Sequence, residues 1–139
     1  IIDDYGHHPV EINSALAAAR LLAPKNKIIS IFQPHRYTRL KDLFDEFCRS
    51  FNDADQVLLL DVYPAGEKSI KNFESIDLER GLANYGHKNV LYIKNQNLLT
   101  KKLIKLIKPN DLIICLGAGS ITNIANNLEK ELQNEDERI

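Results

Sequence analysis

Four short apolar runs recur along this chain, and a pattern of helical spacing follows each of them. The runs occupy residues 27–32 (KIISIF), 56–62 (QVLLLDV), 89–93 (NVLYI) and 111–116 (DLIICL). Runs that are apolar throughout are typical of strands buried on both faces, as in parallel sheets that helices cover on both sides. The sequence therefore predicts an α/β fold, with a single doubly wound domain and a mostly parallel sheet.

Helices are predicted at residues 10–22, 40–51, 74–85, 98–107 and 121–132, where apolar side chains recur every three or four positions. Pro9 suits the first turn of the first helix, and Pro24 ends that helix. The polar tail at residues 133–139 (QNEDERI) is expected to fray. A length of 139 residues suits one domain with one core.

The charge balance, the lengths of the apolar runs and the cysteines disfavour several classes of protein. With 18 basic and 19 acidic side chains the net charge is −1, which disfavours a dedicated nucleic-acid binder. No apolar run is long enough to span a membrane, and no signal-peptide pattern opens the chain. Cys48 and Cys115 are far apart, so we expect reduced thiols in a cytoplasmic protein. Because Ile1 rather than Met comes first, we expect a piece of a longer protein or a processed product.

Polar segments follow three of the predicted strands, at the edge where ligands bind in doubly wound folds. In the first of them, QPHRYTR, Arg36 and Arg39 are three residues apart and share a face if a helix begins there. Two guanidiniums at a helix start repel each other, so an anion between them would stabilise the arrangement. Two solvated surface arginines remain the alternative.

The N-terminal stretch DDYGHHP concentrates ionisable groups before the first helix. Asp3 and Asp4 could cap that helix or bind ribose hydroxyls. His7 and His8 could act as acid–base groups, phosphate donors or metal ligands. The alternative is a polar N-terminal cap in which the histidines are incidental. A zinc site is disfavoured, because the other histidines and cysteines match no zinc spacing.

Two further segments leave alternatives open. GAGS looks like a phosphate-binding turn, but Thr122 stands where G-x-G-x-x-G needs its third glycine, so a tight turn with Ser120 as N-cap explains it as well. The basic segment at residues 101–108 (KKLIKLIK) could touch a membrane surface, although a solvated lysine face over a buried stripe is the simpler interpretation.

Four motifs in this order, DDYGHHPVEI, FQPHRYTRL, DVYPAGE and LGAGSI, together resemble the C-terminal domain of the Mur ligases. The resemblance covers essentially the whole chain and is closest to the branch of the family that adds L-alanine. It implies a Rossmann-like domain over residues 1–139 that binds the amino acid and closes over ATP. The N-terminal UDP-sugar domain and the central ATPase domain of the family would be absent from this chain.

The resemblance also implies an activity. Such ligases use ATP and magnesium to join L-alanine to UDP-N-acetylmuramate through an acyl phosphate. This reaction belongs to peptidoglycan precursor synthesis, and so to cell-wall biogenesis, cell shape and division. The magnesium ligands are expected on the absent central domain, and this domain would supply no catalytic residue or metal ligand. By itself it is expected to be inactive, and its partners would be the other two domains.

Site residues carry over from the family motifs as expectations. Asp4 would bond the ribose of ATP, and His7 would reach the ATP phosphates. The L-alanine pocket, with the two arginines on the carboxylate, would be lined by Tyr5, His35, Arg36 and Arg39.

Three motif residues, His8, Glu67 and Ser120, receive no chemical role from the resemblance. Two other functions stay open. One is a related ligase that recycles a murein tripeptide onto UDP-N-acetylmuramate, and the other is a stand-alone nucleotide-binding module that uses GAGS.

Overall fold

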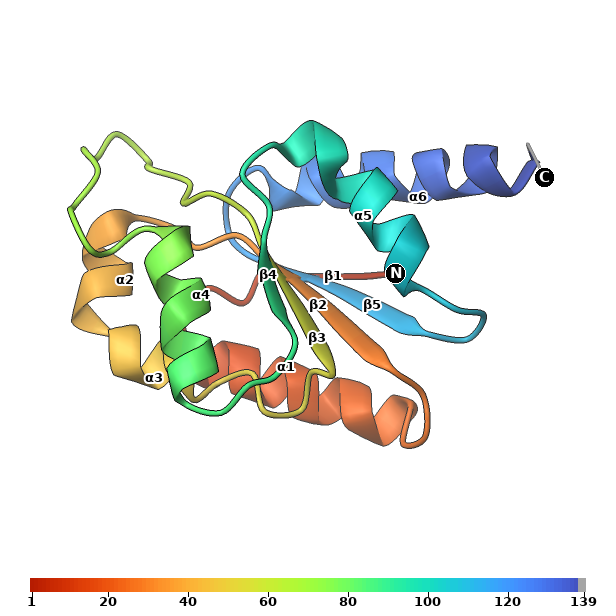
Figure 1. The fold of residues 1–139 in the computed structure, drawn as a ribbon, viewed down its shortest axis with the longest axis horizontal. Coiled ribbons are helices and arrows are strands. Elements are labelled where there is room, and N and C mark those ends of the chain that lie inside the picture. The colour runs from red at the N-terminus through yellow and green to blue at the C-terminus, as the bar shows by residue number, and fades with distance from the viewer. Residues whose placement is uncertain (138–139) are drawn as a thin grey trace.

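A sheet of five parallel strands runs through the middle of the computed structural model, which describes residues 1–137 (Figure 1). The strand order is β1-β5-β2-β3-β4. The predicted α/β class and doubly wound architecture are confirmed, and every strand pair is parallel. The strands are β1 (Ile2–Asp4), β2 (Ile28–Phe32), β3 (Gln56–Leu59), β4 (Val90–Tyr92) and β5 (Leu112–Leu116).

Helices cover both faces of the sheet. The helical segments are α1 (Pro9–Leu22), α2 (Tyr37–Asp42), α3 (Phe44–Cys48), α4 (Ser75–Asn84), the 3-10 turn η1 (Gln96–Leu98), α5 (Leu99–Leu106) and α6 (Ile121–Glu137). One core cluster joins α1 to α4 to one face, and a second joins α5 and α6 to the other. Successive residues of β2 divide between them, since Ile28 and Phe32 pack in the first cluster and Ile29 and Ile31 in the second. The apolar run thus arises because both faces are buried.

The strand β1 was not predicted from the sequence. Two of its three residues are acidic, so it lacks the apolar run that marks the other strands, and it forms through pairing with β5. Asp4 lies opposite Leu116 in this pairing, and its carbonyl oxygen accepts the amide of Gly117 at 3.2 Å. The pairing therefore brings the N-terminal stretch to the carboxyl edge of the sheet.

Two helix predictions were wrong in their bounds. The single helix predicted at residues 40–51 is two short helices, because Leu43 (φ −119°, ψ 23°) departs from helical geometry. The first of them begins earlier than predicted, at Tyr37. The last helix extends beyond its predicted end at residue 132, because no glycine or proline interrupts α6 before Glu137. Residues 138–139 of the predicted polar tail lie outside the described part of the chain.

The two cysteines are buried on opposite faces of the sheet, and both are free thiols. Burial raises the pKa of the Cys48 thiol to about 11 and that of Cys115 to about 12. Both side chains therefore act as small apolar groups of the core. Within residues 1–137, none of the helices is both long enough and apolar enough to cross a membrane.

Candidate functional site

The loops that follow β2 and β3 are tied together at the carboxyl edge of the sheet. His35 pairs with Tyr63 in an isolated parallel bridge. The Arg36 amide donates to the Tyr63 carbonyl at 2.8 Å, and the Tyr63 amide donates to the Pro34 carbonyl at 2.8 Å. The segments QPHRYTR and YPAGE, 28 residues apart from His35 to Tyr63, thus form one surface, as the strand-end rule predicts.

Arg36 occupies the N-cap position of α2 with an unusual backbone conformation. Its φ of 72° and ψ of 135° lie in a region that residues with a Cβ rarely adopt. The Arg36 side chain makes no capping hydrogen bond. A strained residue persists only when its neighbours hold it, so the surroundings of Arg36 are part of the site.

Glu67 supplies the acceptor that the start of α2 lacks. Its Oε1 accepts the Thr38 amide at 3.1 Å, and its Oε2 accepts the Thr38 hydroxyl at 2.5 Å. These hydrogen bonds from Thr38 are the main cause that holds the pKa of Glu67 below its usual range. Glu67, to which the sequence assigned no role, therefore contacts α2 as a carboxylate.

The His35 ring contacts Arg39, and its lowered pKa keeps it neutral at pH 7. Nη1 of Arg39 lies 3.1 Å from His35 Nδ1 and 3.3 Å from the His35 carbonyl oxygen. A guanidinium can only donate, so Nδ1 accepts and the ring hydrogen resides on Nε2. Burial lowers the pKa of His35, and the charges of Arg39 and Arg36 lower it further. The ring can therefore offer Nε2–H as a donor.

Tyr63 was missed as a site residue at the sequence level. Its ring stacks on His35 with centroids 5.4 Å apart and planes 13° from parallel. A Cβ on Gly119 would lie 2.6 Å from Cγ of Tyr63, so this ring also packs against the turn between β5 and α6. Its position directly after a predicted strand was the available signal, but that position does not reveal which side chains the ring touches.

The N-terminal stretch lies next to this surface. The His7 ring is 6.2 Å from the His35 ring and 5.6 Å from the ring of Tyr5, which is exposed. His7 Nδ1 lies 3.1 Å from the Tyr5 carbonyl oxygen and 3.8 Å from a carboxylate oxygen of Glu11. The structure therefore brings Tyr5, His7 and His35 together.

The remaining polar groups of DDYGHHP shape the backbone. His8 is the N-cap of α1, where its Nδ1 accepts the Val10 amide at 3.2 Å. Asp4 Oδ1 accepts the Gly6 amide at 2.8 Å. The expectation that Asp3 or Asp4 might cap the first helix is wrong, because the imidazole of His8 fills that position. The stretch thus forms a polar cap, but His8 is the capping residue itself, a role that the sequence did not predict for it.

The GAGS turn connects β5 directly to α6. The Ser120 carbonyl accepts the amides of Asn123 and Ile124, so Ser120 precedes the helix as predicted. Its hydroxyl, however, accepts from Nε2 of Gln33 at 3.0 Å. Gln33 is buried, and its Oε1 has no hydrogen-bond partner among the described residues. Sequence reasoning did not single out Gln33, because its burial depends on the neighbouring turn.

The two arginines have no acidic partner within the described part of the chain. The ion pairs found there are His7 with Glu11 and Arg20 with Asp55. Arg36 is exposed and Arg39 is half-buried. Two guanidiniums without acidic partners, at one edge of the sheet, are suited to bind a carboxylate or phosphate.

Among the residues that the structure describes, no group of three histidine, cysteine or acidic side chains is arranged to hold a metal ion. The lysines at positions 101, 102 and 105 of α5 are exposed, while Leu99 and Leu103 are buried. This matches the predicted alternative of a solvated lysine face over a buried stripe.

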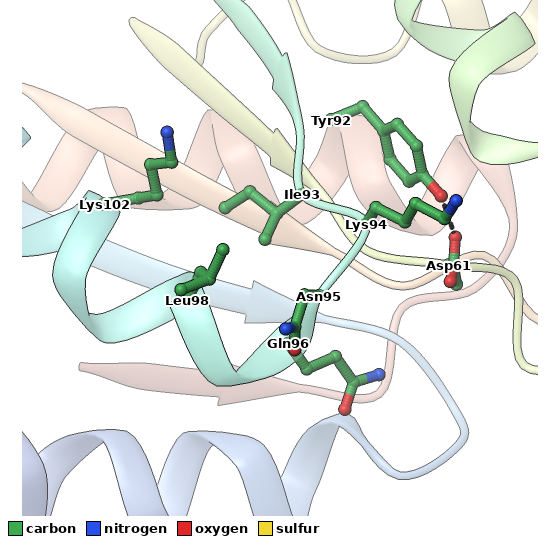
Figure 2. A pocket seen from close by; sticks show the side chains of 8 residues that line it. All are labelled: Asp61, Tyr92, Ile93, Lys94, Asn95, Gln96, Leu98 and Lys102. Atoms are coloured by element: carbon green, nitrogen blue, oxygen red, sulfur yellow. Dashed lines mark hydrogen bonds between the residues drawn. The ribbon is translucent and has the colours of Figure 1, made fainter.

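A cavity of about 570 Å³ lies at the carboxyl ends of β3 and β4 (Figure 2). It is lined by Asp61, Tyr92, Ile93, Lys94, Asn95, Gln96, Leu98 and Lys102. In it the Tyr92 hydroxyl donates to Asp61. Burial raises the pKa of Tyr92, and the Asp61 carboxylate raises it further. None of the predicted site residues lines this cavity.

Comparisons with known proteins place this chain among ligases. Residues 1–119 match the family described as Mur ligase, glutamate ligase domain. The UDP-N-acetylmuramate–L-alanine ligase of Rhodospirillum rubrum is 50% identical over 133 residues, which make up 96% of this chain and 27% of that protein. The protein of the same name from Parvibaculum lavamentivorans is 52% identical over 132 residues, or 95% of this chain and 27% of that protein.

A solved structure agrees with these matches. The UDP-N-acetylmuramate-alanine ligase MurC of Thermotoga maritima superposes with a TM-score of 0.72 at 25% identity, covering 95% of this chain and 26% of that chain. The chain therefore spans about a quarter of the length of the curated relatives that it matches.

Proposed function

The chain belongs to the Mur ligase family, and from this premise we propose that it is the C-terminal domain of an ATP-dependent ligase that joins L-alanine to UDP-N-acetylmuramate. The similarity to proteins of that name along nearly the whole chain supports this substrate pair. The observation that carries the proposal is that Arg36 and Arg39 lie near neutral His35 at the carboxyl edge of the sheet and have no acidic partner among the described residues.

The proposed role of this edge is to bind and orient L-alanine. Arg36 and Arg39 bind its carboxylate, since guanidinium groups form strong, directed hydrogen bonds with carboxylates. The Nε2–H of His35 offers a further donor that adds no positive charge. Tyr5, which is exposed beside His7, covers the bound amino acid when the domains close.

ATP would supply the phosphoryl group that converts the sugar carboxylate into an acyl phosphate. Asp4 uses only Oδ1 to accept the Gly6 amide, so its carboxylate retains accepting capacity for a ribose hydroxyl. His7 lies close enough to His35 to place a ring nitrogen near a phosphate at the same edge. No group of three metal-ligating side chains is found among the described residues, and the proposal assigns the magnesium ligands to the central domain.

The exposure of Tyr5 and Arg36 supports a site that is shared with other domains. A site made of exposed loop residues cannot exclude water alone, and an activated carboxylate hydrolyses if water reaches it. We therefore propose that UDP-sugar and central ATPase domains complete the site in the full-length protein, and that closure brings ATP against Asp4 and His7. The unpaired cysteines fit the reducing cytoplasm, where this step of peptidoglycan synthesis would take place.

The proposal is tested by phosphate release from the full-length protein with ATP, magnesium and UDP-N-acetylmuramate. Release that depends on added L-alanine is the expected result, and residues 1–139 alone should release none. Release that depends only on a murein tripeptide would instead assign the recycling ligase. Release with neither amine donor, together with tight ATP binding by this chain alone, would indicate a nucleotide-binding module.

A further inference from the structure

We infer that Glu67 is a positioning residue for the arginine pair, holding the first turn of α2 in the geometry that binds the carboxylate of the incoming amino acid. The inference rests on the proposed function and adds a role for a side chain that would not touch the substrate.

The first argument is the way in which both carboxylate oxygens of Glu67 are used. One accepts the Thr38 amide and the other accepts the Thr38 hydroxyl. The first amides of a helix have no partner inside the helix, and the N-cap residue Arg36 does not cap them with its side chain. Glu67 thus caps α2 from a loop 29 residues further along the chain.

The second argument is the strain at Arg36. Its amide donates to the Tyr63 carbonyl, and the residue two positions later is bound by Glu67. Both acceptors belong to the loop of residues 63–67, so one loop binds the backbone at the strained residue and two positions after it. Without the Glu67 anchor we expect Arg36 to relax toward a common backbone conformation and to redirect its side chain.

The loop itself is built to aim Glu67 back at α2. The Glu67 amide donates to the Pro64 carbonyl at 3.0 Å, closing a tight turn. Ala65 (φ 50°) and Gly66 (φ 87°) are its two central residues, which is the pattern of a type I′ turn. In Figure 1 the chain after β3 runs out beside α2 before it reaches α4. At the start of this chain segment, the hydroxyl of Tyr92 donates to Asp61.

The third argument concerns charge. The pKa of Glu67 is lowered mainly by the bonds from Thr38, and the charge of Arg36 lowers it further. The carboxylate offsets part of the repulsion between the guanidiniums and the positive end of α2. It does so without an ion pair to Arg36 or Arg39 in the described residues, so no acidic side chain there neutralises either guanidinium. A carboxylate with a lowered pKa and both oxygens occupied is a poor general base.

The test uses the full-length ligase, with KM values measured separately for L-alanine, ATP and UDP-N-acetylmuramate. Glu67→Ala should raise the KM for L-alanine by about tenfold or more, and Glu67→Gln by less, because the amide retains one acceptor. Thr38→Val, which keeps the backbone contact, should raise the KM for L-alanine a few-fold. Thr38→Ser, which keeps the hydroxyl, should have the KM of the unmodified enzyme. The matched control is Glu46→Gln, which removes an exposed carboxylate from α3 and should change none of the three constants.

A double variant separates positioning from general stabilisation. If Glu67 acts through Arg36, Glu67→Ala should add little to the KM increase of Arg36→Ala. The inference would be overturned if the increases in the KM for L-alanine caused by the two substitutions multiplied in the double variant. It would also be overturned if Glu67→Ala lowered the melting temperature but left that KM unchanged. If phosphate release by the unmodified enzyme does not depend on L-alanine, the proposed function itself is refuted.

Discussion

Arg39 donates from Nη1 to Nδ1 of His35 at 3.1 Å, and this contact sets the tautomer of the imidazole. The same guanidinium nitrogen lies 3.3 Å from the His35 carbonyl oxygen, so the side chain of Arg39 is held in place at two points. Because a protonated ring could no longer accept this bond, the contact makes the proposed amino-acid site sensitive to pH.

The first prediction concerns the KM for L-alanine at acidic pH. The pKa of His35 is lowered from 6.5, by burial and then by the neighbouring arginines. The KM for L-alanine should therefore stay constant above that value and rise as the pH falls through the lowered pKa. The unfolded chain takes up this proton at higher pH, so the stability linked to neutral His35 is also lost on acidification between the two pKa values.

The pH profile of kcat/KM for L-alanine in the full-length enzyme checks this prediction. In His35→Asn the side-chain oxygen can still accept from Arg39, but it does not titrate, so the low-pH change should disappear. An unaltered profile in this variant would assign the change to another group.

A second prediction concerns Arg36. Arg36→Ala in the full-length enzyme should raise the KM for L-alanine while leaving that for UDP-N-acetylmuramate nearly unchanged. A lost charge-assisted contact to a carboxylate costs about 1.5–3 kcal/mol, or roughly ten- to hundredfold in KM. Arg80→Ala on α4 is the control, because Arg80 is exposed and lies outside the cluster. An unchanged KM for L-alanine would remove Arg36 from the pocket.

Tyr63 provides a third prediction. Tyr63→Phe keeps the ring that stacks on His35 and packs against Gly119, so its kinetics should match those of the unmodified enzyme. Tyr63→Ala should raise the KM for L-alanine several-fold, because aromatic pairs contribute about 0.5–1.5 kcal/mol and His35 would lose its support. Equal effects of both substitutions would show that the hydroxyl, rather than the stacking, matters.

A fourth prediction tests stability away from the site. Arg20 donates to the carbonyls of Asn26 and Asp53 and to the Asp55 carboxylate, which also accepts the Ile28 amide at 2.8 Å. Burial opposes ionisation of Asp55, but the bonds from Ile28 and Arg20 outweigh it and lower its pKa. This contribution is present above about pH 4 and is lost as the pH falls through the lowered pKa.

Asp55→Asn should therefore destabilise residues 1–139 by on the order of 1 kcal/mol at pH 7, a modest value because the pair is partly exposed. The difference from the unmodified chain should shrink toward pH 3. Urea unfolding at several pH values measures this difference, and a difference that does not vary with pH would contradict the assignment to Asp55.

Local pattern predicted the α/β class well, because β2, β3, β4 and β5 lie in apolar runs of the sequence. The three residues of β1 carry no such pattern, and the break at Leu43 depends on packing rather than on a glycine or proline. Motif resemblance pointed to Tyr5, His7, His35, Arg36 and Arg39, and the structure brings the loops that carry them to one edge. Their roles toward ATP and L-alanine remain predictions.

The sequence by itself determined the layered α/β architecture and the edge of the sheet where the polar motifs meet. Apolar periodicity and the order of strands and helices are local properties, and the direction of parallel strands then sends every following loop to the same side. Only the tertiary structure decided that Glu67 binds Thr38, that Tyr63 stacks on His35 and that Arg36 is strained. These contacts join loops far apart in the chain, and they form because the packed sheet holds those loops within hydrogen-bond and van der Waals distance.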